Sequence, residues 1–95
     1  MSLKSISEII ESLSEEPHLR KALDYWHIVD AFQEAIGGDF ARHTRVISFR
    51  DGTLRVRVPS AVWGMELSFF EKEIIYRINK RLGRDVVKRI EFKGV

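Results

Sequence analysis

Residues 48–63 read SFRDGTLRVRVPSAVW, and this stretch decides the fold. The pair Asp51-Gly52 separates two runs in which apolar and polar residues alternate, and Asp-Gly in that setting is the strongest short-range sign of a β-hairpin. The matching two-residue turn needs positive φ at both positions, which glycine adopts freely. We therefore predict strands over about residues 44–50 and 53–58, joined by a tight turn.

Counting outward from this turn predicts which residues face each other. On one side of the hairpin the opposed pairs are Phe49–Leu54, Ile47–Val56 and Arg45–Val58. On the other side they are Arg50–Thr53, Ser48–Arg55 and Val46–Arg57. The first side is largely apolar and the second carries three arginines, so turn chemistry and residue alternation favour the same register.

Helices are expected on both sides of the hairpin. Apolar residues at helical spacing predict a short helix over residues 3–14 and a second from Pro17 to Ile36, which the glycines at 37 and 38 end. A third helix is predicted over residues 61–82, with Ser60 as its N-cap and Gly83 at its end. It has two apolar stripes, which is typical of a helix between two layers. The stripe assigned to the core is Trp63, Leu67, Phe70, Ile74, Ile78 and Leu82, and the second is Val62, Met65, Phe69 and Tyr76.

The segment from Val86 to Lys93 is predicted to be a strand with Val86, Ile90 and Phe92 facing the core. A strand that returns through a helix to the sheet of an earlier strand forms a parallel crossover. The predicted fold class is therefore α+β, with the element order α-α-β-β-α-β and helices packed on one face of a three-stranded sheet.

The composition points to one small domain, residues 1–95. The chain has no cysteine, no apolar run long enough to cross a membrane and no signal-peptide core, so we expect a cytoplasmic protein. The net charge of +2 conceals an asymmetry, because residues 1–41 carry three basic and eight acidic residues, and the rest carry thirteen and six. This segregation indicates either a basic binding surface or an unevenly charged solvated one.

Short segments along almost the whole chain resemble the DciA family of bacterial proteins in order and spacing. They are FQEAIG (32–37), ARHTR (41–45), DGTLRV (51–56), SAVW and EL (60–63 and 66–67), LG (82–83) and VKRIEF (87–92). The ordered set is specific, although no single segment is. Phe32 stands where the family usually has Trp, which keeps an aromatic packing group.

The resemblance implies a domain similar to the K-homology (KH) nucleic-acid-binding fold and a role with DNA in loading or operating the replicative helicase. Family members often carry a flexible tail implicated in helicase contact, and we expect this chain, whose last residue is Val95, to act without one. KH domains that bind single strands clamp the backbone with a Gly-x-x-Gly loop. This sequence has no such loop, so we expect any nucleic-acid binding to use basic surface instead.

The candidate nucleic-acid contacts are basic residues of the C-terminal half: Arg42, Arg45, Arg50, Arg55, Arg57, Arg84, Lys88, Arg89 and Lys93. Several would share the open face of the sheet, where phosphate binding is one use of such charge. The alternative is a polar face in water that deters aggregation. For the basic residues at the end of the third helix, Arg84 among them, the alternative is interaction with the helix dipole. No aromatic side chain is expected on the open face, which argues against base readout.

Phe69 and Tyr76 are candidate partner-binding residues, because the N-terminal helices are too few to cover the whole second stripe. Trp26 and Trp63 lie on apolar stripes, and we assign both to the core. No catalytic residue, metal site or cofactor is predicted. The three histidines are scattered, and the sequence has neither a phosphate-binding glycine loop nor a positioned base.

The leading hypothesis from the sequence is a non-enzymatic, DciA-like DNA-binding module. Its partners would be single-stranded or forked DNA in preference to RNA, and the replicative helicase by resemblance, with no membrane. One alternative is a protein–protein adaptor that docks through its helical layer. The other is a KH-like RNA-binding protein.

Overall fold

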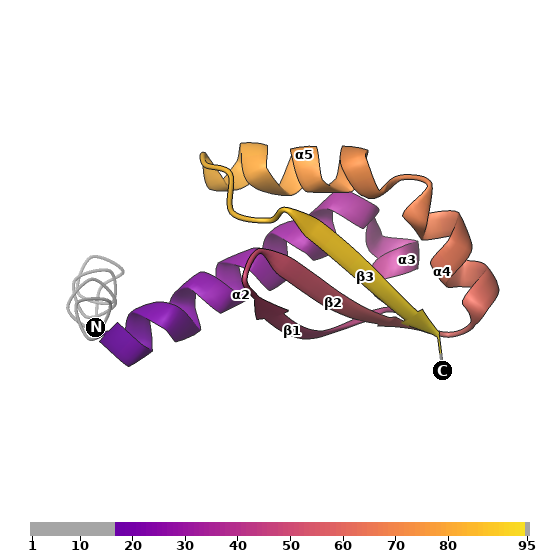
Figure 1. Cartoon of the computed structure of the whole chain (residues 1–95), viewed down its shortest axis with the longest axis horizontal. Helices are drawn as coiled ribbons and strands as arrows, with labels where there is room; N and C mark the ends of the chain where they lie inside the picture. Colours follow the sequence, from indigo (N-terminus) through magenta and orange to yellow (C-terminus); the bar gives the residue numbers. More distant parts are fainter. Residues whose placement is uncertain (1–16, 95) are drawn as a thin grey trace.

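The computed structural model describes residues 17–94 of the chain. The elements are α2 (Pro17–Ile36), α3 (Gly38–Ala41), β1 (Arg45–Arg50), β2 (Thr53–Val58), α4 (Ala61–Ser68), α5 (Glu71–Leu82) and β3 (Arg89–Gly94). The sheet order is β1-β2-β3, with β1 antiparallel and β3 parallel to β2. Figure 1 shows α2 passing behind the sheet and α5 running along it. This is the predicted α+β class, while the helix predicted over residues 3–14 lies outside the described residues.

The core lies between the helices and one face of the sheet. Its buried side chains are Ile28, Ala31, Phe32, Leu54, Val56, Val58, Leu67, Ile74, Ile78, Val87 and Ile90. Alternate residues of the central strand β2 are buried, so Arg55 and Arg57 are exposed on its other side. The hairpin alternation therefore predicted both faces of β2 correctly.

The predicted tight turn is confirmed at Asp51 and Gly52, whose φ angles are 52° and 78°. The Gly52 carbonyl oxygen accepts hydrogen bonds from the Lys88 nitrogen at 2.7 Å and the Arg89 nitrogen at 3.1 Å. The turn therefore also holds the beginning of β3. A Cβ atom on Gly52 would lie 2.8 Å from Lys88 Cγ.

Gly52→Ala is expected to lower the free energy of unfolding by about 1–2 kcal/mol, because a left-handed conformation strains any residue with a Cβ atom. Chemical denaturation measures the change. Gly38→Ala is the matched control, since Gly38 has no positive φ and a Cβ atom there would contact nothing within 4 Å. The control is expected to leave stability unchanged or slightly raised. Equal losses in both variants would contradict this account of the turn.

The predicted register is correct near the turn and wrong beyond Ser48. The confirmed pairs are Arg50–Thr53, Phe49–Leu54 and Ser48–Arg55. Between Val46 and Ser48 the strand contains a bulge, so Val46 pairs with Val56 and Arg45 with Arg57. Ile47 is the extra residue, and its side chain is 42% exposed. Because a one-residue shift exchanges the faces of a strand, Arg45 lies on the open face and Val46 on the core face.

The single helix predicted over residues 61–82 is in fact two helices, α4 and α5, separated by Phe69 and Phe70. The Ser68 hydroxyl donates to the Met65 carbonyl at 2.7 Å, and such side-chain bonds compete with helical ones. The Phe69 and Phe70 nitrogens bond to carbonyls only three residues back, which tightens the last turn. The break lets α4 pack on β3 and α5 on α2. Phe70, which was assigned to the core, is 56% exposed as a result.

The two tryptophans have different environments. Trp63 is half-buried against the core, and the rings of Phe40 and His43 lie edge-on to it at centroid distances of 5.6 and 5.3 Å. Trp26 is 58% exposed, so its assignment to the core is wrong. The reason is its side of the helix, because Trp26 lies about 200° around α2 from the buried Ile28. The face of α2 that does pack on the core is centred on Ile28 and Phe32.

Candidate nucleic-acid interface

The face of the sheet away from the helices carries three rows of side chains, each crossing all three strands. The turn-side row is Arg50, Thr53 and Arg89, the middle row is Ser48, Arg55 and Glu91, and the far row is Arg45, Arg57 and Lys93. We call these nine residues the outer face. Six of them are basic and one is acidic, and neighbouring strands lie about 4.8 Å apart, so the face concentrates positive charge.

The far row is entirely basic. Arg45, Arg57 and Lys93 are all exposed, and within residues 17–94 none of the three takes part in an ion pair. Like charges directly opposed across strands destabilise a sheet. This row therefore presents two guanidinium groups and one ammonium group from adjacent strands to solvent, where a single anion would relieve their repulsion.

The middle row contains the acidic residue of the outer face. Glu91 Oε2 lies 3.1 Å from Arg55 Nε, and Glu91 Oε1 lies 3.7 Å from Arg89 Nη2 of the turn-side row. Exposed pairs of this kind contribute little to stability. These ion pairs partly compensate the positive charge of Arg55 and Arg89, whereas the charge of the far row is uncompensated among the described residues.

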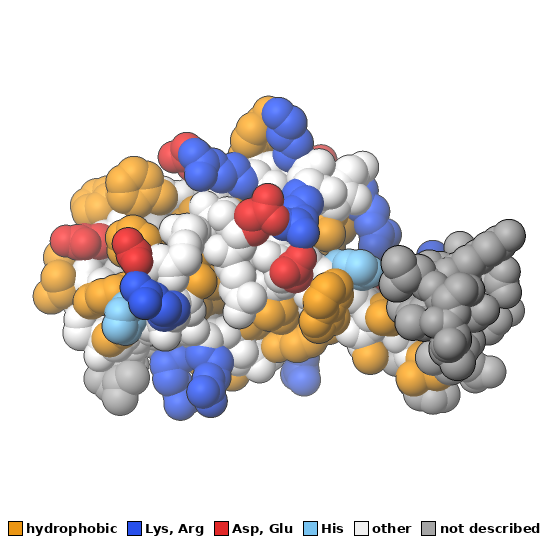
Figure 2. Space-filling view, turned by 180° about the vertical axis from the view of Figure 1, so that it is seen from behind, with side chains coloured by type: hydrophobic (Ala, Val, Ile, Leu, Met, Phe, Trp, Pro, Cys, Tyr) orange, Lys and Arg blue, Asp and Glu red, His pale blue; other side chains and the backbone are white. Residues whose placement is uncertain are grey.

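Two basic residues, Arg81 at the end of α5 and Arg84 in the loop after it, pair with acidic residues of α2. Arg81 pairs with Asp30 at 2.7 Å and also with Glu34, and Arg84 Nη2 lies 3.9 Å from Asp24 Oδ1. Acidic residues of α2 thus compensate Arg81 and Arg84, whereas the far row of the sheet keeps its charge. Figure 2 views the molecule from the helical side and shows red and blue side chains intermixed over the helices, with further blue ones along the lower edge.

Three of the sequence candidates lie outside the outer face. Arg42 follows α3 and pairs with Asp39 at 2.8 Å. Arg84 lies in the loop after α5, against α2. Lys88 is exposed beside Gly52, next to the turn-side row. The structure therefore groups six of the nine candidates on one surface. Arg45 is one of the six, and the bulge places it beside Arg57 in the far row, which the sequence did not predict.

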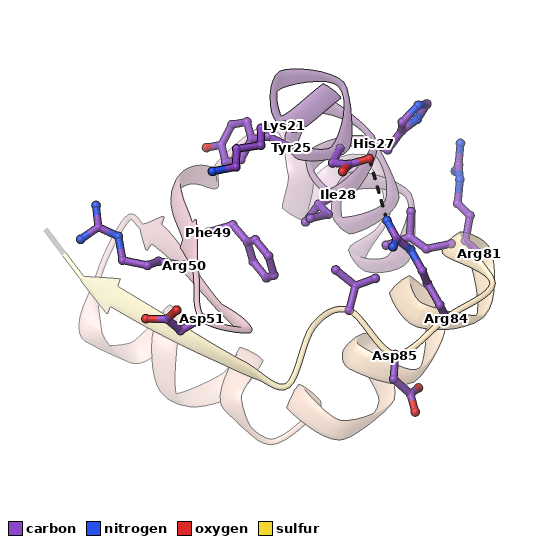
Figure 3. A pocket seen from close by; sticks show the side chains of 13 residues that line it. Lys21, Tyr25, His27, Ile28, Phe49, Arg50, Asp51, Arg81, Arg84 and Asp85 are labelled. Carbon is purple, nitrogen blue, oxygen red and sulfur yellow. Dashed lines mark ion pairs between the residues drawn. The ribbon is translucent and has the colours of Figure 1, made fainter. Parts of the chain in front are cut away.

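A hollow of about 840 Å³ opens between α2, the hairpin turn and the loop after α5. Figure 3 shows Ile28 and Phe49 pointing into it and charged side chains around its rim. The rim carries both signs of charge, and Asp24 and Arg84 pair across it. Because acidic side chains line it, the hollow does not suit a polyanion. Sequence reasoning did not predict this hollow, because it depends on the angle at which α2 leaves the sheet.

An apolar surface lies where α4 meets α5. It consists of Val62, Met65, Phe69 and Phe70, which we call the junction patch, and Phe69 is 80% exposed. Figure 2 shows hydrophobic side chains gathered over this part of the molecule. A groove of about 220 Å³ adjoins the patch and is lined by Phe40, Leu67 and Phe70 among others. Tyr76 is 63% exposed further along α5, so the described helix α2 leaves both Phe69 and Tyr76 uncovered.

The described part of the chain offers no other obvious site. Within residues 17–94 no three His, Asp or Glu side chains are grouped so as to hold a metal ion. None of the helices described in this range combines the length and apolar character needed to cross a membrane.

A family model described as "Dna[CI] antecedent, DciA" matches residues 5–92. UPF0232 proteins of Rhodococcus jostii, Mycobacterium tuberculosis and Corynebacterium glutamicum are 28%, 25% and 24% identical to it over 67 residues. That length is 70% of this chain but 36–38% of those relatives, so the chain spans little more than a third of their length. Because the family model covers nearly all of the sequence, the chain belongs to the DciA family.

Proposed function

We propose that this chain is a non-enzymatic DNA-binding module that contacts phosphates with its outer face and acts with the replicative helicase in DNA replication. Membership of the DciA family, a family of helicase loaders or operators, supports the replication role. The observation that carries the DNA-binding role is the far row, where Arg45, Arg57 and Lys93 stand side by side without an acidic partner among the described residues.

A merely solvated surface explains the far row less well. Charged residues that deter aggregation belong on edge strands, which accounts for Arg45 on β1 and Lys93 on β3 but not for Arg57 on the central strand β2. Opposed like charges also cost stability, and a bound phosphate would remove that cost. Arginine presents a planar fork of donors that matches phosphate oxygens.

The chemistry of the outer face indicates binding without base readout. None of its nine residues is aromatic, and stacking on aromatic rings is the usual way in which single-stranded bases are held. Phosphate contacts position a protein on nucleic acid and carry no sequence information. We therefore expect affinity that depends strongly on salt and weakly on sequence.

The direct test is a fluorescence-anisotropy titration of the protein with single-stranded, duplex and forked DNA and with RNA at several salt concentrations. We expect DNA binding with a log–log salt slope of about −2 to −4, which corresponds to three to five phosphate contacts. Absence of binding at low salt would refute the proposal. Tight RNA binding with weak DNA binding would establish the KH-like RNA-binding alternative instead.

A second function, docking of a protein partner, is favoured by the junction patch. Exposed apolar groups that form a contiguous patch on a charged domain commonly mark interaction sites. Phe69 is the most exposed of the large apolar side chains among the described residues, and the adjoining groove has room for an apolar side chain of a partner. A bacterial replicative helicase is the partner that family membership suggests.

Phe69→Ser is expected to abolish helicase binding or self-association while changing the free energy of unfolding by less than about 0.5 kcal/mol, as is usual for exposed sites. Co-sedimentation and chemical denaturation measure the two quantities. Trp26→Ser is the matched control, because Trp26 is an exposed aromatic residue on α2, away from the patch. A loss of stability of about 3 kcal/mol or more would show that Phe69 belongs to the core and would remove the basis for this docking surface.

A further inference from the structure

Glu91 is the one acidic residue among the nine of the outer face, and it lies in the middle row, on the edge strand β3 beside Arg55 of β2. Its carboxylate lies 3.1 Å from Arg55 Nε and 3.7 Å from Arg89 Nη2. The Glu91 side chain is 32% exposed, so it is accessible from the solvent. A single carboxylate therefore engages guanidinium groups of two rows, while the far row keeps all of its charge.

A carboxylate and a phosphate offer arginine the same kind of acceptor, two oxygens that match its fork of N–H donors. Arg55 Nε donates its N–H group to Glu91 Oε2. An approaching phosphate would use the same N–H group. It cannot serve both acceptors fully at once. Glu91 consequently competes with any phosphate that reaches the middle row.

The spacing of the rows determines which ligands compete with Glu91 for Arg55. Residues that point to one face of a strand recur about every 6.6 Å, so the far row and the turn-side row are about 13 Å apart with Glu91 between them. A small anion held by Arg45, Arg57 and Lys93 does not reach Glu91. A nucleic-acid strand that lies along β2 and spans all three rows does.

We propose that Glu91 is an internal competitor for phosphate that limits how tightly the outer face holds a nucleic-acid strand. This inference rests on the proposed DNA binding and names the residue that tunes it. In the free protein Glu91 occupies Arg55 and Arg89. In the complex Glu91 keeps Arg55 from making a full phosphate contact, and its own charge opposes the strand. The face releases DNA more readily than an all-basic sheet would.

The first test compares the full chain with Glu91→Gln in titrations with an oligodeoxythymidine of about 15 nucleotides, comparable to the sites of small single-strand-binding domains. Glu91→Gln is expected to steepen the log–log salt slope by about 0.7, which is one further phosphate contact, and to raise affinity about fivefold at 0.1 M salt. Glu66→Gln removes the same charge from α4, outside the outer face, and is expected to leave the slope unchanged.

A double-mutant cycle distinguishes competition from a structural role. Arg55→Gln is expected to weaken binding by less than about twofold in the wild-type chain, because Glu91 already compensates Arg55. In the Glu91→Gln background the same substitution is expected to weaken binding by about fivefold, because Arg55 is then engaged with phosphate. A purely structural ion pair would give the same effect of Arg55→Gln in both backgrounds.

The outcomes separate this inference from the proposed function. If the wild-type chain shows no salt-dependent binding, the proposed function fails. If the wild-type chain binds and loss of the far row weakens it, but Glu91→Gln changes neither affinity nor slope, the function stands and the competitor role of Glu91 is overturned. Should Glu91→Gln fail to fold, Glu91→Thr, which is neutral and well suited to a strand, replaces it with the same expected results.

Discussion

The triple variant Arg45→Gln/Arg57→Gln/Lys93→Gln is expected to bind single-stranded DNA about a hundredfold more weakly than the wild-type chain at 0.1 M salt. Each phosphate contact contributes about 0.7 to the log–log salt slope of a single strand, so the loss of three contacts reduces that slope by about 2. Anisotropy titrations over a range of salt concentrations measure both quantities. Because glutamine removes the repulsion within the far row, stability is expected to be unchanged or slightly higher.

The matched control removes the same charge from α5. Lys72, Arg77 and Lys80 are exposed on that helix and do not belong to the outer face. Replacing all three by glutamine lowers the net charge equally and is expected to change affinity by less than about threefold, through the long-range field alone. Equal weakening by both triple variants would show that binding follows net charge and that the far row is not a site.

Asn79→Ala is expected to lower the free energy of unfolding by about 3 kcal/mol, because it leaves three half-buried backbone groups without partners. Asn79 Oδ1 accepts from the Val86 nitrogen at 3.0 Å and the Val87 nitrogen at 2.9 Å, and Nδ2 donates to the Val87 carbonyl at 2.9 Å. The side chain thereby ties α5 to the segment that leads into β3. Chemical denaturation followed by circular dichroism measures the loss.

Asn79→Asp is the informative companion variant. It keeps both accepted hydrogen bonds and loses the donated one, and it places a carboxylate against the Val87 carbonyl oxygen. We expect a loss of roughly half that of the alanine variant, since one bond of three is removed and a repulsive contact added. A loss below about 1 kcal/mol for Asn79→Ala would contradict the role of this side chain in positioning β3.

The local chemistry of the turn made part of the fold predictable. Asp51-Gly52 determines the pairing as far as Ser48, because the turn type and the alternation of residues agree there. Beyond Ser48 the sequence has Val46 and Ile47 in succession, and either can face the core. The bulge selects Val46, and nothing in the alternation of residue types indicates where an extra residue will be placed. The basic far row depends on that bulge and therefore appeared only in the structure.

The helical layer shows the same limit for a different reason. Apolar periodicity runs without interruption through Phe69 and Phe70, so the sequence alone predicts one helix. The break between α4 and α5 accompanies tertiary packing, in which α4 contacts β3 and α5 contacts α2. Charge segregation along the chain was visible beforehand, whereas the pairing of Arg81 with Asp30 and Glu34 depends on the contact between α5 and α2.

β3 also begins later than predicted, at Arg89 instead of Val86. Val87, which the alternation did not place in the core, is fully buried. The side chain of Asn79 satisfies the backbone of residues 86 and 87, so these residues need no strand partner. A lone asparagine in an amphipathic helix gives no sequence signal for this role, since its partners lie seven and eight residues further on.

Chemical-shift mapping of the isotope-labelled protein during titration with single-stranded DNA tests the central claim most directly. The account predicts that the largest amide and arginine side-chain shifts fall on the outer face, at Arg45, Arg57 and Lys93 above all, and that they diminish as salt is added. Shifts confined to α5 or the junction patch, with the outer face unaffected, would contradict it.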